Sequence, residues 1–422
     1  MPNVADLELP GLELDDPGLK GRRWHREMNG LLDSGHWLAR APLATVVLDR
    51  EAGEFFLRTK SAIFPGRLLA DLFGVTDGPL REQIDHNIIN QEGDSHRRLR
   101  GLVNPSLSPR AATAYRPAMR EFLEGLWGSL DVSDEFDFIE AFAQPYPSLT
   151  IARVMGAPAA DAPRLHDWSM WIQRQFDAIA LSDPDTVATI QQKVAEFYDW
   201  VRPLIEQRRS TPSDDLISSL IATEEEGERL SDVELENLVL NILVGGVDTT
   251  QNQLAHVMRL LAANPEQWAA LREDPETLVP RAVQEGLRFE PITPFTARQL
   301  TGDLEYRGVN FPAGTVIMVC SFTGNRDPEA FADPTEFDIT IDREKARSLT
   351  FGAGIHFCVG SNLAKAEMAE ALGFFAERVE ELELCDQPEF QTVSGIYGID
   401  SLYLKVTPAQ PTDLIQPGAA AA

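Results

Sequence analysis

The sequence has few cysteines, few positive charges and no long hydrophobic run. Cys320, Cys358 and Cys385 are too few and too odd in number for a disulfide framework. No apolar stretch reaches the roughly 18 residues that a membrane-spanning helix needs, because the longest candidate, residues 238–247, contains Asn241. The 37 basic residues face 66 acidic ones, which gives a net charge of −29. Such an acidic surface repels phosphate, so the composition argues against a nucleic-acid partner.

The ends and the middle of the chain lack further signals. The first ten residues are acidic and have neither the basic segment nor the apolar core of a signal peptide, so we expect a soluble, cytoplasmic protein. Hydrophobic residues make up 43% of the chain, enough for a sizeable core, and no Pro/Gly/Ser-rich linker divides it. We expect an irregular extension over residues 1–20, a single domain over residues 21–410 and a disordered tail over residues 411–422.

Helical patterns dominate what is present. Residues 44–58 are the exception, because two β-prone runs flank Arg-Glu-Ala-Gly and predict a small β-hairpin. Residues 164–209 predict a helical hairpin that breaks at residues 182–184. Ser231 and Glu234 form a capping-box pattern before about 30 proline-free residues, which predicts one long, buried helix that ends before Pro265.

The most specific stretch is FGAGIHFCVG, residues 351–360. Cys358 ends a glycine-punctuated loop and precedes a run of strong helix formers, and a thiol near a helix N-terminus has a lowered pKa and is held as thiolate. The glycines permit positive φ and a close approach of the backbone to a flat, bulky group. We interpret Cys358 as a metal ligand, with a buried free cysteine as the alternative.

This decamer fits F-G-x-G-x-H-x-C-x-G at every specified position and resembles the haem-binding loop of the cytochrome P-450 superfamily. The resemblance implies a mainly α, prism-shaped fold with a small β region and a long central helix over the haem. It implies haem b as cofactor and Cys358 as the proximal thiolate on iron. Phe351 would pack beside the sulfur, the N–H of Gly360 would hydrogen-bond it, and His356 would reach a haem propionate.

Two other stretches fit haem binding under the same resemblance. His96 and Arg100 are four residues apart, so they share a helix face, and a cationic pair suits a carboxylate. The resemblance assigns both to a propionate, whereas an exposed basic helix is the alternative. Arg298 follows an extended segment, and relatives use the corresponding arginine for a propionate as well. An exposed strand arginine is the alternative there.

The segment Gly245-Gly246-Val247-Asp248-Thr249 breaks the local rules of a buried helix. Two glycines weaken a helix, and an unpaired aspartate is costly to bury. The segment resembles the oxygen-activation motif of the family, in which the glycines leave room for dioxygen, Thr249 hydrogen-bonds the bound oxygen, and Asp248 passes protons inward from solvent. A helix kink and a threonine bonded to the preceding turn are the alternatives.

A third motif is structural. Glu285 and Arg288 match the E-x-x-R pair that supports the haem loop in the family. Its usual third member is an arginine after Phe-Asp, but Ile341 follows residues 337–340 here. Arg343 takes that position if two residues are inserted.

Together the motifs imply a monooxygenase that inserts one oxygen atom of O₂ into a C–H or C=C bond of a small apolar substrate. Two alternatives stay open: an electron-independent peroxygenase or isomerase, and a non-catalytic haem-thiolate sensor. The residues expected at the substrate are apolar or aromatic: Val244, Val247, Ile292, Phe295, Ile396 and Tyr397. Residues 164–209 would form a lid over it, with ordinary packed helices as the alternative.

The sequence shows no flavin or iron–sulfur domain, so the resemblance implies electrons from a separate ferredoxin and its reductase. The expected docking surface is a basic island on an otherwise acidic protein. Its members are Arg97, Arg98, Arg110 and Lys365.

Overall fold

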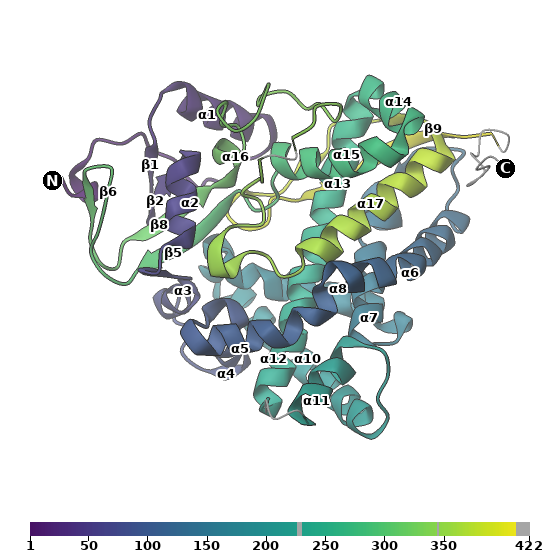
Figure 1. Cartoon of the computed structure of the whole chain (residues 1–422), viewed down its shortest axis with the longest axis horizontal. Coiled ribbons are helices and arrows are strands. Elements are labelled where there is room, and N and C mark those ends of the chain that lie inside the picture. The colour runs from purple at the N-terminus through teal and green to yellow at the C-terminus, as the bar shows by residue number, and fades with distance from the viewer. Residues whose placement is uncertain (226–229, 344–345, 411–422) are drawn as a thin grey trace.

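The structure is a computed structural model that describes residues 1–225, 230–343 and 346–410, so the expected tail over residues 411–422 lies outside the described residues. Long helices make up most of it and the sheets are small, which confirms the predicted mainly α fold with a small β region. Figure 1 shows the largest sheet and the N-terminal helices on one side of the molecule and the long helices on the other.

The α-helices of the described residues are, in chain order, α1 (Gly21–Asp33), α2 (Arg50–Arg58), α3 (Gly66–Leu72), α4 (Gly78–His86), α5 (Gly93–Val103), α6 (Pro109–Gly128), α7 (Pro145–Met155), α8 (Ala162–Gln173), α9 (Ala178–Leu181), α10 (Pro184–Ser210), α11 (Leu216–Glu225), α12 (Asp232–Gly246), α13 (Asp248–Ala263), α14 (Pro265–Glu273), α15 (Pro275–Phe289), α16 (Ser321–Gly324) and α17 (Ser361–Arg378). None of them has both the length and the hydropathy that crossing a bilayer requires.

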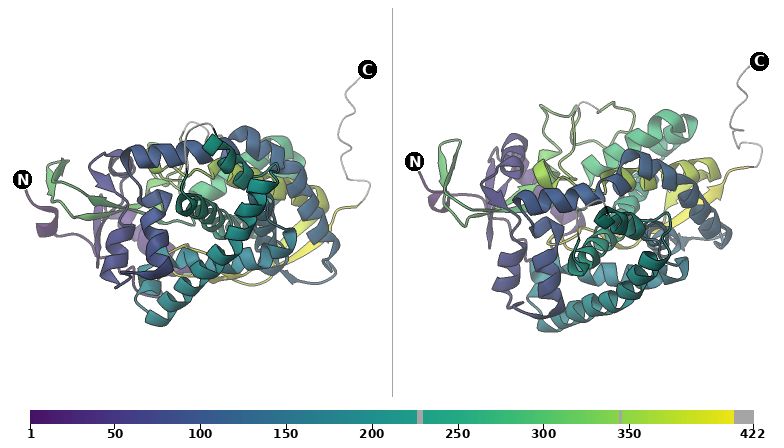
Figure 2. Two further views of the ribbon diagram at one scale, coloured as in Figure 1. Left: turned by 90° about the horizontal axis from the view of Figure 1, so that it is seen from below. Right: turned by 60° about the horizontal axis from the view of Figure 1, so that its bottom comes forward.

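The largest sheet has five strands in the order β1 (Leu38–Ala41), β2 (Ala44–Val47), β8 (Val316–Cys320), β5 (Phe295–Leu300) and β3 (Ala62–Ile63). Strands β2 and β8 pair in parallel and the other neighbours are antiparallel. A second sheet has the order β4 (Phe136–Asp137), β12 (Tyr403–Pro408) and β9 (Val379–Leu384). Two short hairpins are β6 (Leu304–Tyr306) with β7 (Val309–Phe311), and β10 (Glu389–Phe390) with β11 (Ile399–Ser401). Figure 2 shows that the β6–β7 hairpin projects at the same end of the molecule as the N-terminus.

The predicted β-hairpin over residues 44–58 is wrong in its second half. The hairpin is formed by β1 and β2 instead, and residues 50–58 are helix α2. Asp49 starts that helix, because its side chain accepts the backbone N–H of Ala52 at 2.7 Å. Phe56 and Leu57 then lie on its buried face, so capping and tertiary packing outweigh their strand propensity.

The predicted long helix is two helices in nearly continuous succession. Its start is confirmed: Ser231 and Glu234 exchange both hydrogen bonds of a capping box, at 3.2 and 2.9 Å. The helix is then interrupted at Val247, which separates α12 from α13. Two glycines just before the break weaken the helix, and the Thr249 hydroxyl bonds back to the Gly245 carbonyl at 2.7 Å, a contact that bends helices.

The predicted helical hairpin is present as α8 and α10, and α10 begins after the predicted break at Ser182 and Asp183. Its first arm ends earlier than expected, because α8 stops at Gln173 and a 3-10 turn and the short helix α9 follow. The Asp183 carboxylate caps α10 by accepting the N–H groups of Asp185 and Thr186. Helix α8 packs against both α10 and α12, and the Trp168 ring meets Phe197 of α10 edge-on at 5.7 Å.

A buried ion-pair cluster fastens the N-terminal helix to the rest of the molecule. Glu290, which follows α15, is fully buried and lies 3.0 Å from both His25 of α1 and Arg259 of α13. Burial raises the pKa of Glu290, but His25 and Arg259 lower it by more, so it stays well below its usual value. This carboxylate is therefore charged at neutral pH and joins three helices.

The N-terminal residues 1–20 contain a short 3-10 helix, η1 (Val4–Asp6), and pack closely against the rest of the molecule. A backbone bridge joins Gly11 to Arg40 of β1, and the Arg40 guanidinium donates to the Val4 carbonyl at 2.9 Å. Leu12 and Leu19 are buried in a core cluster with residues of α1 and the five-stranded sheet. The extension therefore closes one face of that sheet.

Candidate functional site

The cysteine lies at the end of a tight loop before α17. Gly352 and Gly354 have φ of 67° and 74°, so the predicted positive φ is confirmed for these two. A Cβ at Gly354 would also lie 2.7 Å from the Leu57 carbonyl oxygen of α2, which only glycine avoids. The N–H of Cys358 donates to the Phe351 carbonyl at 2.9 Å and closes the loop.

The sulfur of Cys358 accepts backbone N–H groups from Gly360 and Ser361 at the start of α17. Burial raises the pKa of the Cys358 thiol, and the two N–H groups and Arg100 offset only part of that rise. The predicted lowering of this pKa is therefore wrong for the protein without a metal, although a cation bound at the sulfur would deprotonate it outright. Gly360 has an ordinary φ of −82°, and its missing side chain leaves room beside the sulfur.

Four side chains that the sequence predicted for one ligand group come together beside this loop: His96, Arg100, Arg298 and His356. The rings of His96 and His356 are 4.5 Å apart between centroids. Arg100 donates to the backbone carbonyl of Phe357 in the loop. A carboxylate that the sequence did not single out, Glu92, accepts from His356 at 3.0 Å.

His96 and Arg298 are buried, Arg100 and His356 are half-buried, and the four side chains share one carboxylate, Glu92. Burial and nearby cations lower the pKa of both His96 and His356 to about 4, so both imidazoles are neutral at pH 7. Burial also lowers the pKa of Arg298 to about 10. Its guanidinium is 3% exposed and donates to its neighbour, the Ala297 carbonyl, at 2.8 Å. Buried hydrogen-bond donors need acceptors, and the described residues supply one carboxylate to this group. Carboxylates of a bound ligand would satisfy the remaining donors.

The break between α12 and α13 has one packed and one open side. A Cβ at Gly246 would overlap the Ile151 side chain of α7, whereas a Cβ at Gly245 would meet open space. Gly246 thus allows close helix packing, and Gly245 leaves its backbone bare toward a space that a flat ligand can approach. Thr249 lies one turn later, with its hydroxyl on the Gly245 carbonyl.

Asp248 is 4% exposed and has no cationic side chain in hydrogen-bond contact within the described residues. Burial raises the pKa of Asp248 to about 7, although the amide of Asn252, 2.8 Å away, and the more distant charge of Arg174 both lower it. The carboxyl is therefore shared between its protonated and charged forms near neutral pH, as a proton donor requires.

A family model described as "Cytochrome P450" matches residues 166–380. The chain is 36% identical over 405 residues to luteothin monooxygenase of Streptomyces thioluteus, a match that covers 96% of this chain and 97% of that protein. This chain belongs to the cytochrome P450 family. It is also 32% identical over 317 residues to cyclomarin C epoxidase CymV of Salinispora arenicola (strain CNS-205), covering 75% and 79% of the two chains. The crystal structure of CalO2 superposes with a TM-score of 0.85 at 27% identity, covering 92% of this chain and 97% of that chain.

The protein is thus a cytochrome P450 monooxygenase, an oxidoreductase with a haem iron cofactor that acts on a substrate with O₂. Its described residues fit a haem on two independent observations. The buried donors around Glu92 suit two propionates, and the bare backbone at Gly245 suits a flat ring.

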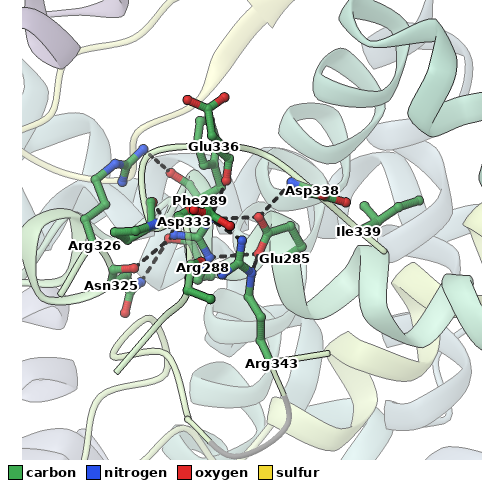
Figure 3. Close-up of polar contacts among 12 residues, drawn as sticks. Glu285, Arg288, Phe289, Asn325, Arg326, Asp333, Glu336, Asp338, Ile339 and Arg343 are labelled. Carbon is green, nitrogen blue, oxygen red and sulfur yellow. Dashed lines mark hydrogen bonds and ion pairs between the residues drawn. The ribbon is translucent and has the colours of Figure 1, made fainter. Parts of the chain in front are cut away.

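In this P450, the pair Glu285 and Arg288 of α15 lies at the centre of a polar network (Figure 3). Both side chains are 2% exposed or less, and two hydrogen bonds of 2.8 and 2.7 Å join them. Arg343 forms an ion pair with Glu285 at 2.8 Å, so the two-residue insertion considered from the sequence brings Arg343 into the network.

The same network reaches the loop itself. Arg288 donates to the backbone carbonyls of Asn325, Pro334 and Glu336. The Asn325 side chain in turn accepts the N–H of Leu349, two residues before Phe351, at 2.6 Å. The charges on α15 therefore hold the irregular segment after residue 324 and the start of the cysteine loop in one rigid unit.

The residues predicted for the substrate pocket do not form one group. Val244 and Val247 are buried in the main core at the α12–α13 break, and Ile292 lies beside the C-terminal turn, because its carbonyl accepts the N–H of Tyr397. Ile396 is half-buried. Phe295 and Tyr397 lie instead in the core cluster that α1 forms with the five-stranded sheet, where the Phe295 ring meets the Trp24 ring edge-on at 5.7 Å.

Tyr397 differs most from its predicted place at the substrate. Its ring is fully buried and stacks on Phe390, and its hydroxyl accepts the N–H of Gly21 at the start of α1. In the described protein this side chain therefore joins the C-terminal turn to α1, a long-range contact that the sequence does not reveal.

Sequence reasoning missed three polar residues beside the predicted ones: Glu92, which is half-buried, and Asn252 and Glu367, which are buried. Glu92 and Asn252 lie four residues from His96 and Asp248, so helical spacing alone would have marked them. Glu367 of α17 is 1% exposed and accepts from Thr250 at 3.4 Å, while its other carboxyl oxygen has no partner among the described residues. Burial raises the pKa of Glu367 well above its usual value, and nothing in its local sequence signals this.

The four residues of the predicted basic island differ in their environment. Arg97 pairs with Asp94, and Arg98 with Glu234 of α12, so part of their charge is compensated. Lys365 lies over the Phe351 ring at 5.5 Å. It also lines a pocket of about 400 Å³ whose other walls include Arg343, Arg347, Phe351 and Phe357. The pocket opens beside the cysteine loop.

Proposed function

We propose that this P450 binds haem b through the Cys358 thiolate and hydroxylates or epoxidises a small apolar molecule. The observation that carries the proposal is the cysteine loop: a sulfur that accepts two backbone N–H groups, beside a buried set of carboxylate-binding side chains. Phe351 would pack beside the sulfur, and the Gly360 N–H would tune its electron donation. His96, Arg100, Arg298 and His356 would bind the propionates.

The haem supplies the activation of O₂, and the chain supplies protons, orientation and a dry pocket. We propose that Asp248 gives its proton inward and regains one from solvent on the side of Arg174. Thr249 would hold the transferred proton at its hydroxyl, next to the open space at Gly245. The pKa of Asp248, about 7, supports this role, because it allows both proton release and proton uptake near neutral pH.

The support for an apolar substrate comes from the kind of residues near the helix break and from the names of two relatives. Val244, Val247 and Ile292 are apolar and lie near the α12–α13 break or the C-terminal turn, which supports an apolar substrate. The names of two relatives, a monooxygenase and an epoxidase, support hydroxylation or epoxidation. We do not assign Phe295, Ile396 and Tyr397 to direct contact with the substrate and place them behind the pocket wall. The Phe295 and Tyr397 rings pack in the core cluster between α1 and the five-stranded sheet.

We further propose that electrons come from a separate ferredoxin, which docks over the cysteine loop. Lys365, Arg347 and Arg343 line the pocket there. Arg110 lies in the first turn of α6, and the segment just before α6 contacts the start of α17, because the Asn362 amide donates to the Leu107 carbonyl. Charge reversal at Lys365 and Arg110 is expected to slow reduction at low salt and to have little effect at high salt, because steering is screened. Equal reduction rates at low salt would contradict the docking site.

The deciding experiment is the carbon monoxide difference spectrum of the dithionite-reduced protein. Thiolate ligation predicts a far-red-shifted Soret band, and Cys358→Ala should abolish it. Cys385→Ala, which changes a cysteine outside the loop, is the matched control and should leave the band in place. A Soret band at an ordinary haem-protein position in the unchanged protein would refute the thiolate proposal, and a protein that binds no haem would refute the whole assignment.

A further inference from the structure

The side-chain amide of Asn252 in α13 donates both to the carboxyl and to the backbone carbonyl of Asp248. The residue is fully buried. Its amide nitrogen lies 2.8 Å from the Asp248 carboxyl oxygen Oδ1 and 2.9 Å from the Asp248 backbone carbonyl. One amide therefore spans the side chain and the backbone of the same acid, which fixes the rotamer of that acid.

The other end of the Asn252 amide is held by the C-terminal turn. Its oxygen Oδ1 accepts the N–H of Ile399 at 3.4 Å, and a Cβ at Gly398 would overlap the same oxygen. The turn is itself anchored, because the Tyr397 N–H donates to Ile292 and the Tyr397 carbonyl binds the His256 ring, 2.8 and 2.9 Å away. Because residue 398 is a glycine, its backbone can lie in direct contact with the Asn252 side-chain amide.

Other polar groups near this part of α13 face different atoms. His166 of α8 binds Gln251 at 2.9 Å, and Glu367 of α17 faces Thr250. Arg174 acts on Asp248 through its charge only, with no hydrogen bond to it among the described contacts. The amide of Asn252 is therefore the hydrogen-bond donor that the described residues give to the Asp248 side chain.

We propose that Asn252 is a positioning residue for Asp248, and that the backbone turn at Gly398 and Ile399 sets the orientation of Asn252. The C-terminal turn thereby determines where the proton-donating acid points, although it lies far from Asp248 in the sequence. The inference rests on the proposed role of Asp248 as proton donor, and it adds the two residues and the turn that orient the Asp248 carboxyl.

The first test changes the amide in the haem-loaded enzyme. Asn252→Leu keeps the volume but removes the donor, so the carboxyl loses its fixed rotamer. We expect the fraction of electrons that end in product rather than in hydrogen peroxide to fall about tenfold, less than the roughly 100-fold loss that a misplacement of about 1 Å can cause. The pH at which this fraction falls should also move upward, because the lost hydrogen bond favoured the charged form of Asp248.

A direct readout that needs no turnover is the infrared band of the protonated carboxyl in the resting enzyme. The band of Asp248 is assigned by its loss in Asp248→Asn, and that of Glu367 by its loss in Glu367→Gln. In Asn252→Leu, the Asp248 band should persist to higher pH than in the unchanged protein. The Glu367 band should not move.

The second test acts from the turn. Gly398→Ala is expected to push the amide aside and to reproduce the Asn252→Leu effects on product fraction and on the Asp248 band. In an Asn252→Ala background the same change should add little, since the overlapping Asn252 oxygen is gone and the other close atom, Gln391 Oε1 at 2.6 Å, is the far end of a flexible side chain. Gly373→Ala is the matched control, because a Cβ there meets open space, and it should leave both readouts unchanged.

The outcomes separate this inference from the proposed function. If Asp248→Asn leaves the product fraction intact, the proton role of Asp248 is wrong and the proposed function fails at that point. If Asp248→Asn lowers it but Asn252→Leu and Gly398→Ala change neither the pH profile nor the infrared band, the positioning role alone is refuted.

Discussion

Two regions of this P450 bury carboxylates in opposite ways. At the end of α15, Glu285 and Glu290 each contact cationic side chains, and the pKa of Glu290 stays well below its usual value. In the α12–α13 region, Asp248 and Glu367 have hydrogen bonds but no ion-pair partner among the described residues, and both pKa values are raised. Burial alone favours the neutral acid, and a cation at about 3 Å reverses that preference.

The presence or absence of a cationic partner distinguishes carboxylates that stabilise the fold from a carboxylate that can exchange a proton. Charges that are permanently paired hold segments together, as Glu290 holds three helices and Glu285 holds the approach to the cysteine loop. An unpaired acid is costly to bury when it is charged, so burial raises its pKa, to about 7 for Asp248. In our proposal, buried carboxylates therefore hold segments together in one region, and Asp248 carries protons in the other.

The largest expected effect comes from breaking the paired region. Arg288→Ala leaves the Glu285 carboxylate with Arg343 alone and removes the donor to three backbone carbonyls. We expect a loss of about 3–5 kcal/mol in the free energy of unfolding, measured by urea titration. The exposed pair of Arg67 with Asp85 provides the control, because Arg67→Ala should cost at most about 1 kcal/mol. Equal losses in the two variants would contradict the distinction.

The unpaired region should show the reverse dependence on pH. Below about pH 4, Asp248 is protonated in both the folded and the unfolded state; between pH 4 and 7 only the folded state keeps the proton, so stability falls as pH rises. The fall is at most about 4 kcal/mol, from a folded pKa of about 7. Asp248→Asn lacks this term, so its stability relative to the unchanged protein should rise from pH 4 to 7 and then level off. Parallel stability curves from pH 4 to 8 would contradict this expectation.

Glu290→Gln should give the opposite sign. The folded pKa of Glu290 is lowered, so its contribution is complete above its unfolded pKa and is lost as the pH falls through the folded value. We expect a loss of about 1.5–3 kcal/mol at pH 7, the range for hydrogen bonds to charged groups. The difference between the two proteins should shrink on acidification below pH 4.5. A constant difference would mean that the ion pairs contribute little.

The smallest effects distinguish the two sides of the helix break. Gly246→Ala brings a Cβ onto Ile151, so we expect the protein to lose about 1–3 kcal/mol. Gly245→Ala meets open space and should be neutral or stabilising by up to about 1 kcal/mol. It should nevertheless weaken substrate binding, measured as the spin-state shift of the haem on substrate titration. Identical stabilities would show that the two glycines are equivalent.

Local spacing predicted the parts of the site that lie within one segment. The capping box at Ser231, the cysteine loop and the pair His96 and Arg100 depend on residues close in sequence, so their patterns survive without tertiary information. Strand propensity misled over residues 50–58, where the Asp49 cap and the burial of Phe56 favour a helix instead.

The remaining features depend on partners far along the chain. Glu290 meets His25, and Tyr397 meets Gly21, across most of the sequence. The raised pKa of Cys358 likewise follows from burial rather than from its place before a helix. No periodicity reports these contacts or this burial, because they arise only when α1, α15 and the C-terminal turn pack together.

The order of the chain during synthesis gives the cysteine loop a further property. Its partners Arg100, Leu57 and Asn325 precede it in the chain, whereas Ser361 and Lys365 of α17 follow it directly. Part of the surface that receives the loop is therefore already synthesised when the loop leaves the ribosome. Asn252, in contrast, awaits Gly398 and Ile399, which emerge near the end of translation. In our proposal, the nascent chain therefore contains the haem-binding loop and its partners before it contains the turn that orients Asn252 and, through Asn252, Asp248.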